Sequence, residues 1–450
     1  MKLSMLHRAS LGMILFAAAA PVWPQVDSAG AQPAATGTTD NDQRMATPPP
    51  VSVENYPLSF TSETARRNYL IGGLRFSSAY DDNVFPSAGR AVSDTSYSIW
   101  PFISLDQARS RLSWTLSYSP GFTFYQKTTA LNQADHNAAA TLQYRLSPHV
   151  TLKLGDTFVK TSNFFSQYAE NPGGTTFGGL ANPNIAVIAP IGEQYNNTGN
   201  VQLSYQFSPN AMVGVNGIFF DLRYPNRNQT GSGLFDSSSR AGEAFYTHRL
   251  SGKHYVGATY RFQDLLSYPG DFETQTQSMV LFYTFYFSHT TSISLFGGPE
   301  YSDTSGTGIV TQRTWTPAAG GSFLWQGQHT SFTAEASHRV NTGGGLIGAA
   351  QSQNGSAALR RQLSRNLNVG VGANYTKNDL LDSFAFAKSN GHLVSGNAFA
   401  ERQLGEHFAF HVEYMRLHQS YPGLASIALA PDRNRVSASL SYRFQRPLGR

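Results

Sequence analysis

The strict two-residue alternation of the segment 436–444 constrains this chain most. Apolar side chains occupy every second position, with serine or arginine between them; the apolar set is Val436, Ala438, Leu440, Tyr442 and Phe444. Only a β-strand places alternate residues on opposite faces, so the pattern predicts a strand with one apolar and one polar face. The fold must therefore provide two different environments on the two sides of one sheet.

The same alternation recurs in pairs of segments between residues 69 and 444. Short turns with Ser-Pro, Ser-Gly or Gly-polar steps, which are typical of hairpins, join the members of each pair; they are 106–110, 147–149, 208–210, 251–253, 288–290, 327–328, 364–366 and 405–406. The other connections are long and rich in Gly, Asn and Pro, for example 162–194, 225–238, 302–312, 340–350 and 419–432. Eight turns join sixteen strands, and one more strand at each end predicts about eighteen.

Composition favours a membrane barrel over a soluble all-β fold. Charged residues are 14% of the chain, whereas roughly a quarter is usual for a soluble protein. A soluble sandwich or propeller would carry more Lys and Glu on its outward faces than the Ser, Thr and Asn found here. We therefore predict an all-β, transmembrane, antiparallel up-and-down β-barrel with short periplasmic turns and long extracellular loops. Two segments are less regular: 212–220 is apolar on both faces, and 279–287 places Val280, Phe282 and Tyr286 on the inner face.

The segment 436–444 also resembles the closing strand of bacterial outer-membrane barrels, in which an alternating run ending in an aromatic residue directs insertion. The resemblance implies the barrel-assembly machinery as a partner, besides outer-membrane lipid and lipopolysaccharide. The chain departs from that pattern because residues 445–450 follow Phe444.

The N-terminal region predicts export. Lys2 and Arg8 precede a short apolar core and small residues, which is the pattern of a signal peptide, assigned to residues 1–24. Residues 25–68 are rich in Ala, Thr, Gly and Pro and are predicted to form a disordered periplasmic linker. The barrel is then 69–444, and 445–450 form a periplasmic tail. The chain has no cysteine, which excludes disulfides and thiolate metal sites.

Charged residues of the polar parity are predicted to face the lumen, because a charge facing lipid near the midplane is costly. The predicted pore-lining residues are Arg75, Arg111, Arg145, Lys153, Glu243, Arg249, Arg261, Glu335, Arg339, Arg360, Glu401 and Glu413, with Arg443 beside the last turn. Either this set makes a cation-rich lumen that favours anions, or opposite charges pair across strands and hold or block the barrel.

The run Tyr80-Asp81-Asp82-Asn83-Val84-Phe85 ends the first alternating segment. With the hairpin repeats that follow, it resembles the β-barrel porin type 2 family, whose members often accompany exopolysaccharide secretion. The resemblance covers about 69–444 and implies a porin and exopolysaccharide as a partner. From the residues alone, the carboxylates could bind Ca²⁺ or could cap a turn.

No motif of an enzyme or of a nucleic-acid-binding protein appears. The candidates for a hydrolase are Asp135-His136, expected on a loop, with His338 on an outward and His411 on an inward strand position. We predict neither an enzyme nor a cofactor or metal site, and the formal charge of +5 forms no basic block for nucleic acid.

The predicted function is a channel that passes small solutes or exported polysaccharide through a polar, arginine-rich lumen, with the loop 162–194 as constriction. The alternatives are a closed structural or adhesive barrel whose loops bind a surface partner, and an outer-membrane lipid hydrolase.

Overall fold

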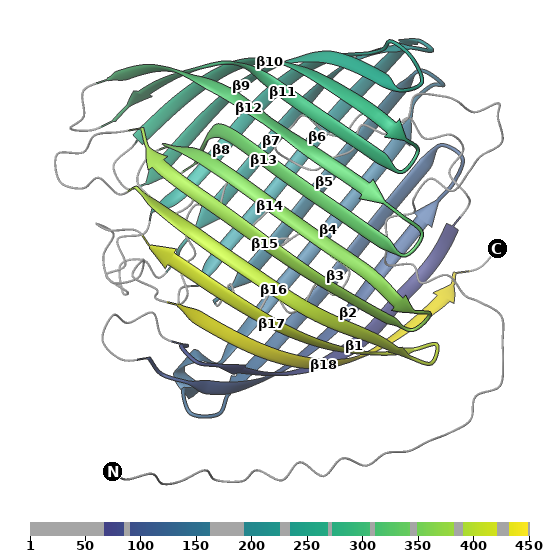
Figure 1. Cartoon of the computed structure of the whole chain (residues 1–450), viewed down its shortest axis with the longest axis vertical. Coiled ribbons are helices and arrows are strands. Elements are labelled where there is room, and N and C mark those ends of the chain that lie inside the picture. Colours follow the sequence, from purple (N-terminus) through teal and green to yellow (C-terminus); the bar gives the residue numbers. More distant parts are fainter. Residues whose placement is uncertain are drawn as a thin grey trace. The chain divides into compact units, whose positions relative to one another are not determined.

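The computed structural model describes residues 67–84, 91–162, 193–225, 235–268, 272–306, 311–342, 349–381, 390–420 and 432–448. Eighteen antiparallel strands form one sheet, each paired with its neighbours along the chain, and the pairing of the first strand with the last closes the sheet into a barrel (Figure 1). The predicted fold class is confirmed. No helix in the described part of the chain is long and apolar enough to cross a membrane.

The strands are long, and one short 3₁₀ helix, η1 (Thr129–Leu131), lies between β3 and β4. They are β1 (Arg67–Asp81), β2 (Asp94–Ala108), β3 (Leu112–Tyr125), β4 (Gln133–Arg145), β5 (Val150–Thr161), β6 (Gln194–Ser208), β7 (Ala211–Arg223), β8 (Asp236–Arg249), β9 (His254–Tyr268), β10 (Phe272–Ser288), β11 (Thr291–Ser305), β12 (Gln312–Gln326), β13 (Thr330–Thr342), β14 (Ala349–Ser364), β15 (Leu367–Leu380), β16 (Gly391–Leu404), β17 (Phe408–Ser420) and β18 (Arg433–Pro447).

The eight short turns all lie at one end of the barrel, as predicted. The first turn is shorter than the sequence pattern indicated, because β2 continues to Ala108 and β3 begins at Leu112. In the last turn Gly405 adopts a φ of 79°, in the left-handed region that glycine enters without a steric penalty. Both β1 and β18 also have their outer ends on this side, since Asn68 accepts a backbone hydrogen bond from Leu448 at 2.9 Å.

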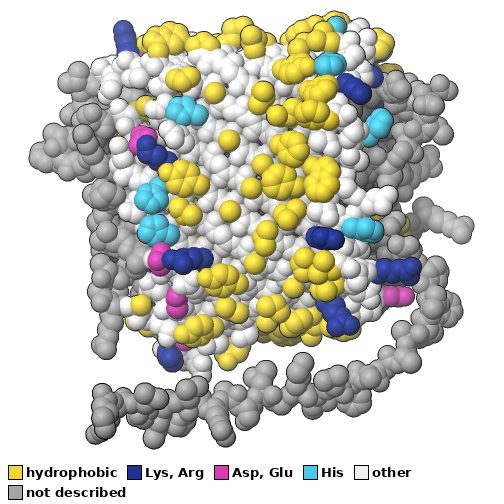
Figure 2. Space-filling model, in the orientation of Figure 1, with side chains coloured by type: hydrophobic (Ala, Val, Ile, Leu, Met, Phe, Trp, Pro, Cys, Tyr) yellow, Lys and Arg dark blue, Asp and Glu magenta, His cyan; other side chains and the backbone are white. Residues whose placement is uncertain are grey.

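Exposed large apolar side chains on the outward faces of the strands form an apolar belt; on the face drawn in Figure 2 they spread over the middle, and charged side chains lie toward its two sides. Aromatic side chains mark its two edges: Tyr205, Phe207 and Tyr246 cluster near the short turns, and Tyr301 packs against Trp315 near the other end at 5.1 Å between ring centroids. On β12 the exposed Trp315 and Trp325 are ten residues apart. At ~3.3 Å per residue and a tilt of ~40° this spans about 25 Å, the height of a membrane-facing belt.

The barrel strands extend beyond the predicted boundaries of 69 and 444. β1 begins at Arg67, and β18 continues to Pro447, so the first half of the predicted tail is strand; Gln445 and Pro447 lie opposite Ile71 and Tyr69. The apolar alternation stops earlier because strand pairing continues below the belt, where lipid no longer demands apolar side chains. The predicted signal peptide and nearly all of the predicted linker lie outside the described residues.

The wall between β12 and β13 separates in its loop-side half. The last paired residues are Ala319 and His338, and β12 continues to Gln312 without a partner on β13 among the described residues. Pro317 stands where the pairing ends, and a proline has no N–H to donate to a neighbouring strand. β13 continues to pair with β14 as far as Thr342 and Ala349, and β14 pairs with β15 as far as Ala350 and Leu380, so these strand ends separate from β12 together.

The end of the β13–β14 pair bends into the lumen, whereas the sequence pattern placed 340–350 in an outer connection. Val340 and Ala349 are buried against Leu265 of β9, four strands away around the sheet. Glu300 on β11 accepts a hydrogen bond from the Val340 amide at 2.9 Å. We call residues 339–342 with 349–352 the infolded segment. Within the predicted connection, residues 340–342 and 349–350 are strand residues that buried apolar contacts and a carboxylate hold inside, and residues 343–348 lie outside the described residues.

Candidate functional site

The lumen face carries the predicted charges. The alternation of buried and exposed residues places eleven of the twelve predicted residues on the inward parity of their strands: Arg75, Arg145, Lys153, Glu243, Arg249, Arg261, Glu335, Arg339, Arg360, Glu401 and Glu413. Arg111 differs, because it lies in the exposed turn between β2 and β3. Whether any of them lines a route for solute stays a prediction.

A basic wall lies on the lumen face of β1 and β18. Arg75 of β1 and Arg443 of β18 were predicted there, and Arg433 and Arg435 of β18 were missed. Both missed residues share the parity of Arg443, so the alternation in 436–444 could have identified them if it had been extended backwards to residue 433. Among the described residues, the inward charges of these two strands are four arginines and one carboxylate, Asp81.

The Asp81-Asp82-Asn83 motif fastens the first strand to the last. Asp81 pairs with Arg433 through Nε at 2.7 Å and through the terminal guanidinium nitrogen, in a buried position. Asp82 accepts hydrogen bonds from the backbone and side-chain nitrogens of Asn434 at 2.7 and 2.6 Å. Asp81 also accepts from the Asn83 amide at 3.1 Å, the local turn expected of such a motif. The carboxylates therefore cap a turn and latch the barrel seam.

The opposite side of the lumen is filled. Glu243 on β8 and Arg261 on β9 form an ion pair of 3.3 Å, and both are almost fully buried. Arg339 of the infolded segment lies over the Phe296 ring of β11, 4.3 Å from its centroid. These charged side chains are therefore paired or packed against a ring, and they are not exposed to water in an open lumen.

Inward apolar side chains add to this filled side. Phe220 and Leu222 of β7 are fully buried, and Val280 and Phe282 of β10 pack with Ala318 of β12. These are the segments whose sequences lacked a clean polar face, and they face a packed interior rather than water. β7–β13 thus enclose packed side chains, whereas on β18 and β1 Arg433 and Arg435 are buried and Arg75 and Arg443 are half-buried.

The proposed hydrolase residues do not form a catalytic group. Asp135 and His136 lie within β4 and not on a loop, so they project to opposite faces: Asp135 is buried inside, and His136 contacts the Tyr118 hydroxyl outside at 2.8 Å. His411 lies between two inward carboxylates, with Nδ1 3.8 Å from Glu401 and Nε2 3.9 Å from Glu413. The described residues contain no group of three or more His, Asp or Glu placed to hold a metal ion.

The sheet is closed, its outward face is apolar, and its strands are paired over most of the wall. This is the architecture of an outer-membrane protein, since lipid tolerates no unpaired backbone. No family model matches the chain, and no curated protein matches its sequence. The likeness to the β-barrel porin type 2 family stays a prediction.

Several solved outer-membrane structures are similar in three dimensions. OpdK from Pseudomonas aeruginosa has 10% identity and a TM-score of 0.41, covering 84% of this chain and 99% of that one. OccAB4 from Acinetobacter baumannii has 10% identity and a TM-score of 0.43, covering 85% and 99%. OprD from P. aeruginosa has 9% identity and a TM-score of 0.44, covering 85% and 96%.

Proposed function

We propose that the barrel is a passive channel for small anionic solutes, which pass along the basic wall of β1 and β18. The observation that carries the proposal is the pair Arg75 and Arg443, half-buried on the adjacent lumen faces of β1 and β18, with the buried Arg433 and Arg435 on the same face nearer Asp81. They extend along the barrel from the Asp81 latch toward the short-turn end. Guanidinium groups along a pore lower the barrier for anions and raise it for cations, without any covalent chemistry.

The infolded segment acts in this proposal as the constriction. It occupies the lumen beside β8–β11 and leaves the basic wall as the route for solute. The loop 162–194, predicted as constriction from its length, lies largely outside the described residues, so that hypothesis stays a prediction. The support for the infolded segment is physical: the Glu300 hydrogen bond and the Leu265 contacts hold it in place.

The first experiment is single-channel conductance and reversal potential of the refolded protein in a planar bilayer. Wild type is expected to conduct with anion preference, and the double change Arg75→Ala with Arg443→Ala is expected to lower that preference. The matched control is the double change Arg361→Ala with Arg402→Ala, which removes the same charge from the outward face near the short turns. An equal effect of the control, or no conductance from a demonstrably folded barrel, would contradict the proposal.

The constriction is tested separately with Glu300→Ala. Loss of the carboxylate frees the Val340 amide and is expected to raise conductance, because the infolded segment loses its polar anchor. Ser302→Ala, a small change on the same inward face of β11, is the control and should leave conductance unchanged. Unchanged conductance in both variants would exclude the infolded segment as the narrowest point.

The family resemblance implies exported polysaccharide as an alternative solute for the channel. Liposome-swelling rates with neutral and acidic oligosaccharides distinguish it from a route for small anions. A closed barrel is favoured by one specific observation, the packing of β7–β13, and predicts that neither solute enters. In that case the loops would carry the function by binding a surface partner.

A further inference from the structure

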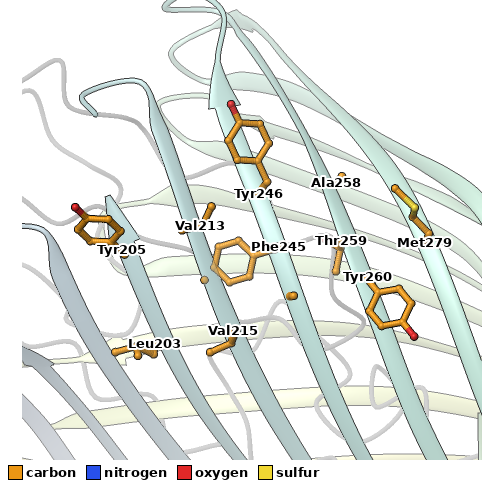
Figure 3. A pocket seen from close by; sticks show the side chains of 12 residues that line it. Leu203, Tyr205, Val213, Val215, Phe245, Tyr246, Ala258, Thr259, Tyr260 and Met279 are labelled. Carbon is orange, nitrogen blue, oxygen red and sulfur yellow. The ribbon is translucent and has the colours of Figure 1, made fainter. Parts of the chain in front are cut away.

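An apolar groove crosses the outer face of the barrel over β6–β10 (Figure 3). Its volume is about 560 Å³. Small residues form the floor and larger side chains rise on both sides: the floor contains Gly214, Ala244 and Ala258, and the sides contain Leu203, Tyr205 and Met279.

The local sequence explains why the wall is hollow here. Ala244 and Ala258 occupy outward positions next to Tyr246 and Tyr260, so adjacent outward side chains differ greatly in size. Gly214 lies on the inward parity of β7, between the outward Val213 and Val215, so it contributes only backbone to the groove. The groove is therefore built into the strands and does not depend on a loop.

The groove lies toward the short-turn end of the apolar belt. Tyr205 and Tyr246 belong to the aromatic edge near the short turns, and Tyr246 lies only three residues before Arg249, the last residue of β8. Because the belt faces the bilayer interior, whatever fills the groove must itself be apolar along most of its length.

The turn beyond the groove is basic and lacks carboxylates. The strands that supply the floor, β8 and β9, are joined by the sequence His248-Arg249-Leu250-Ser251-Gly252-Lys253-His254. Its two histidines lie at the level of the aromatic edge, because His248 contacts the Tyr246 hydroxyl at 3.2 Å and His254 contacts the Tyr283 hydroxyl at 2.6 Å. An apolar groove thus leads to a turn that carries Lys253 and no carboxylate at the interface.

We propose that this groove and turn bind one glycerophospholipid of the inner leaflet, with an acyl chain in the groove and the phosphate at Lys253 of the turn. Charge complementarity selects this occupant over a second copy of the chain, whose belt would bring no phosphate to the turn. Phospholipid is preferred to lipopolysaccharide because the short turns face the periplasm. A lysine at a membrane interface attracts lipid phosphates while its stem packs on apolar surface.

The test is native mass spectrometry of the whole protein released from nanodiscs that contain phosphatidylglycerol. Wild type is expected to retain one phospholipid per barrel. Ala244→Phe fills the groove and is expected to weaken retention by about tenfold or more. Ala140→Phe makes the same change at an exposed outward position of β4, away from the groove, and should retain the lipid.

Two further arms separate the parts of the site. Lys253→Glu should weaken retention of phosphatidylglycerol, and nanodiscs doped with diacylglycerol, which has no phosphate, should show no retained adduct. The proposal would be overturned if Ala140→Phe lost the phospholipid as readily as Ala244→Phe, or if diacylglycerol were retained equally well. It would also be overturned by an adduct of lipopolysaccharide alone, or by a dimer that Ala244→Phe abolishes. The conductance of Ala244→Phe should equal that of wild type. The lipid proposal and the channel proposal can therefore fail independently of each other.

Discussion

Replacing Asp81 by alanine removes the carboxylate that joins the first strand to the last. Both partners are nearly inaccessible to solvent, with side-chain exposures of 5% for Arg433 and 6% for Asp81. The substitution leaves Arg433 buried without this carboxylate, which is the costly way to break such a pair. We expect the free energy of unfolding to fall by about 3–5 kcal/mol.

A matched pair at the rim provides the comparison. Arg416 and Asp432 form an ion pair of 2.9 Å, but their side chains are 57% and 50% exposed. Water screens such a pair and can replace either partner, so Asp432→Ala should cost only about 0–1 kcal/mol. The two substitutions remove the same side chain and differ mainly in burial.

The assay is reversible urea unfolding of the refolded barrel in lipid vesicles, followed by tryptophan fluorescence. Arg433→Ala and the double variant with Asp81→Ala complete a cycle, in which the double variant should lose less than the sum of the two single losses. If Asp81→Ala lowers the unfolding free energy no more than Asp432→Ala does, the latch does not stabilise the closed barrel.

Three further outcomes are expected. Gly298→Ala places a methyl group against a backbone carbonyl of β10 and should cost about 1–3 kcal/mol in the same unfolding assay, whereas Gly355→Ala, with open space around it, should change little. Leu281→Arg, in the middle of the belt, should cost about 2–4 kcal/mol, and Trp315→Arg at its edge only about 0–1 kcal/mol, because the lipid penalty depends on depth. Asp94→Ala removes the acceptor of two backbone amides in the segment after β3, so hydrogen exchange of these amides should accelerate; unchanged exchange would show that the bonds do not order the segment.

The fold could be predicted from the sequence because each spanning strand must satisfy lipid on one side and the lumen on the other. The alternation in 112–124 and 436–444 is a direct record of that requirement, and turn chemistry at positions such as Gly405 supplied the strand count. The strand ends were less accessible, since residues such as Gln445 pair below the belt, where no apolar side chain is needed.

The lumen was harder to predict because its contents depend on distant contacts. Parity placed Glu243 and Arg261 inside, but it could not show that they pair with each other. The infolded segment escaped prediction for the same reason: Val340 and Leu265 meet across four strands, and only Pro317 hinted that the wall would separate there. Residues adjacent in sequence can also be far apart in their environment: Asp135 and His136 lie in one strand and project to opposite faces.

The contact between β1 and β18 also orders the assembly of the barrel in time. In the described sheet every other neighbouring pair is a hairpin of consecutive strands, whereas this pair joins the two extremes of the barrel sequence. Closure therefore carries the largest loop entropy and the highest contact order of any step, and the edge of β1 stays open until the last strand is present. A circular permutant cut at 405–406, with the outer ends of β1 and β18 joined by a short linker, should form the same sheet with this seam converted into a local hairpin.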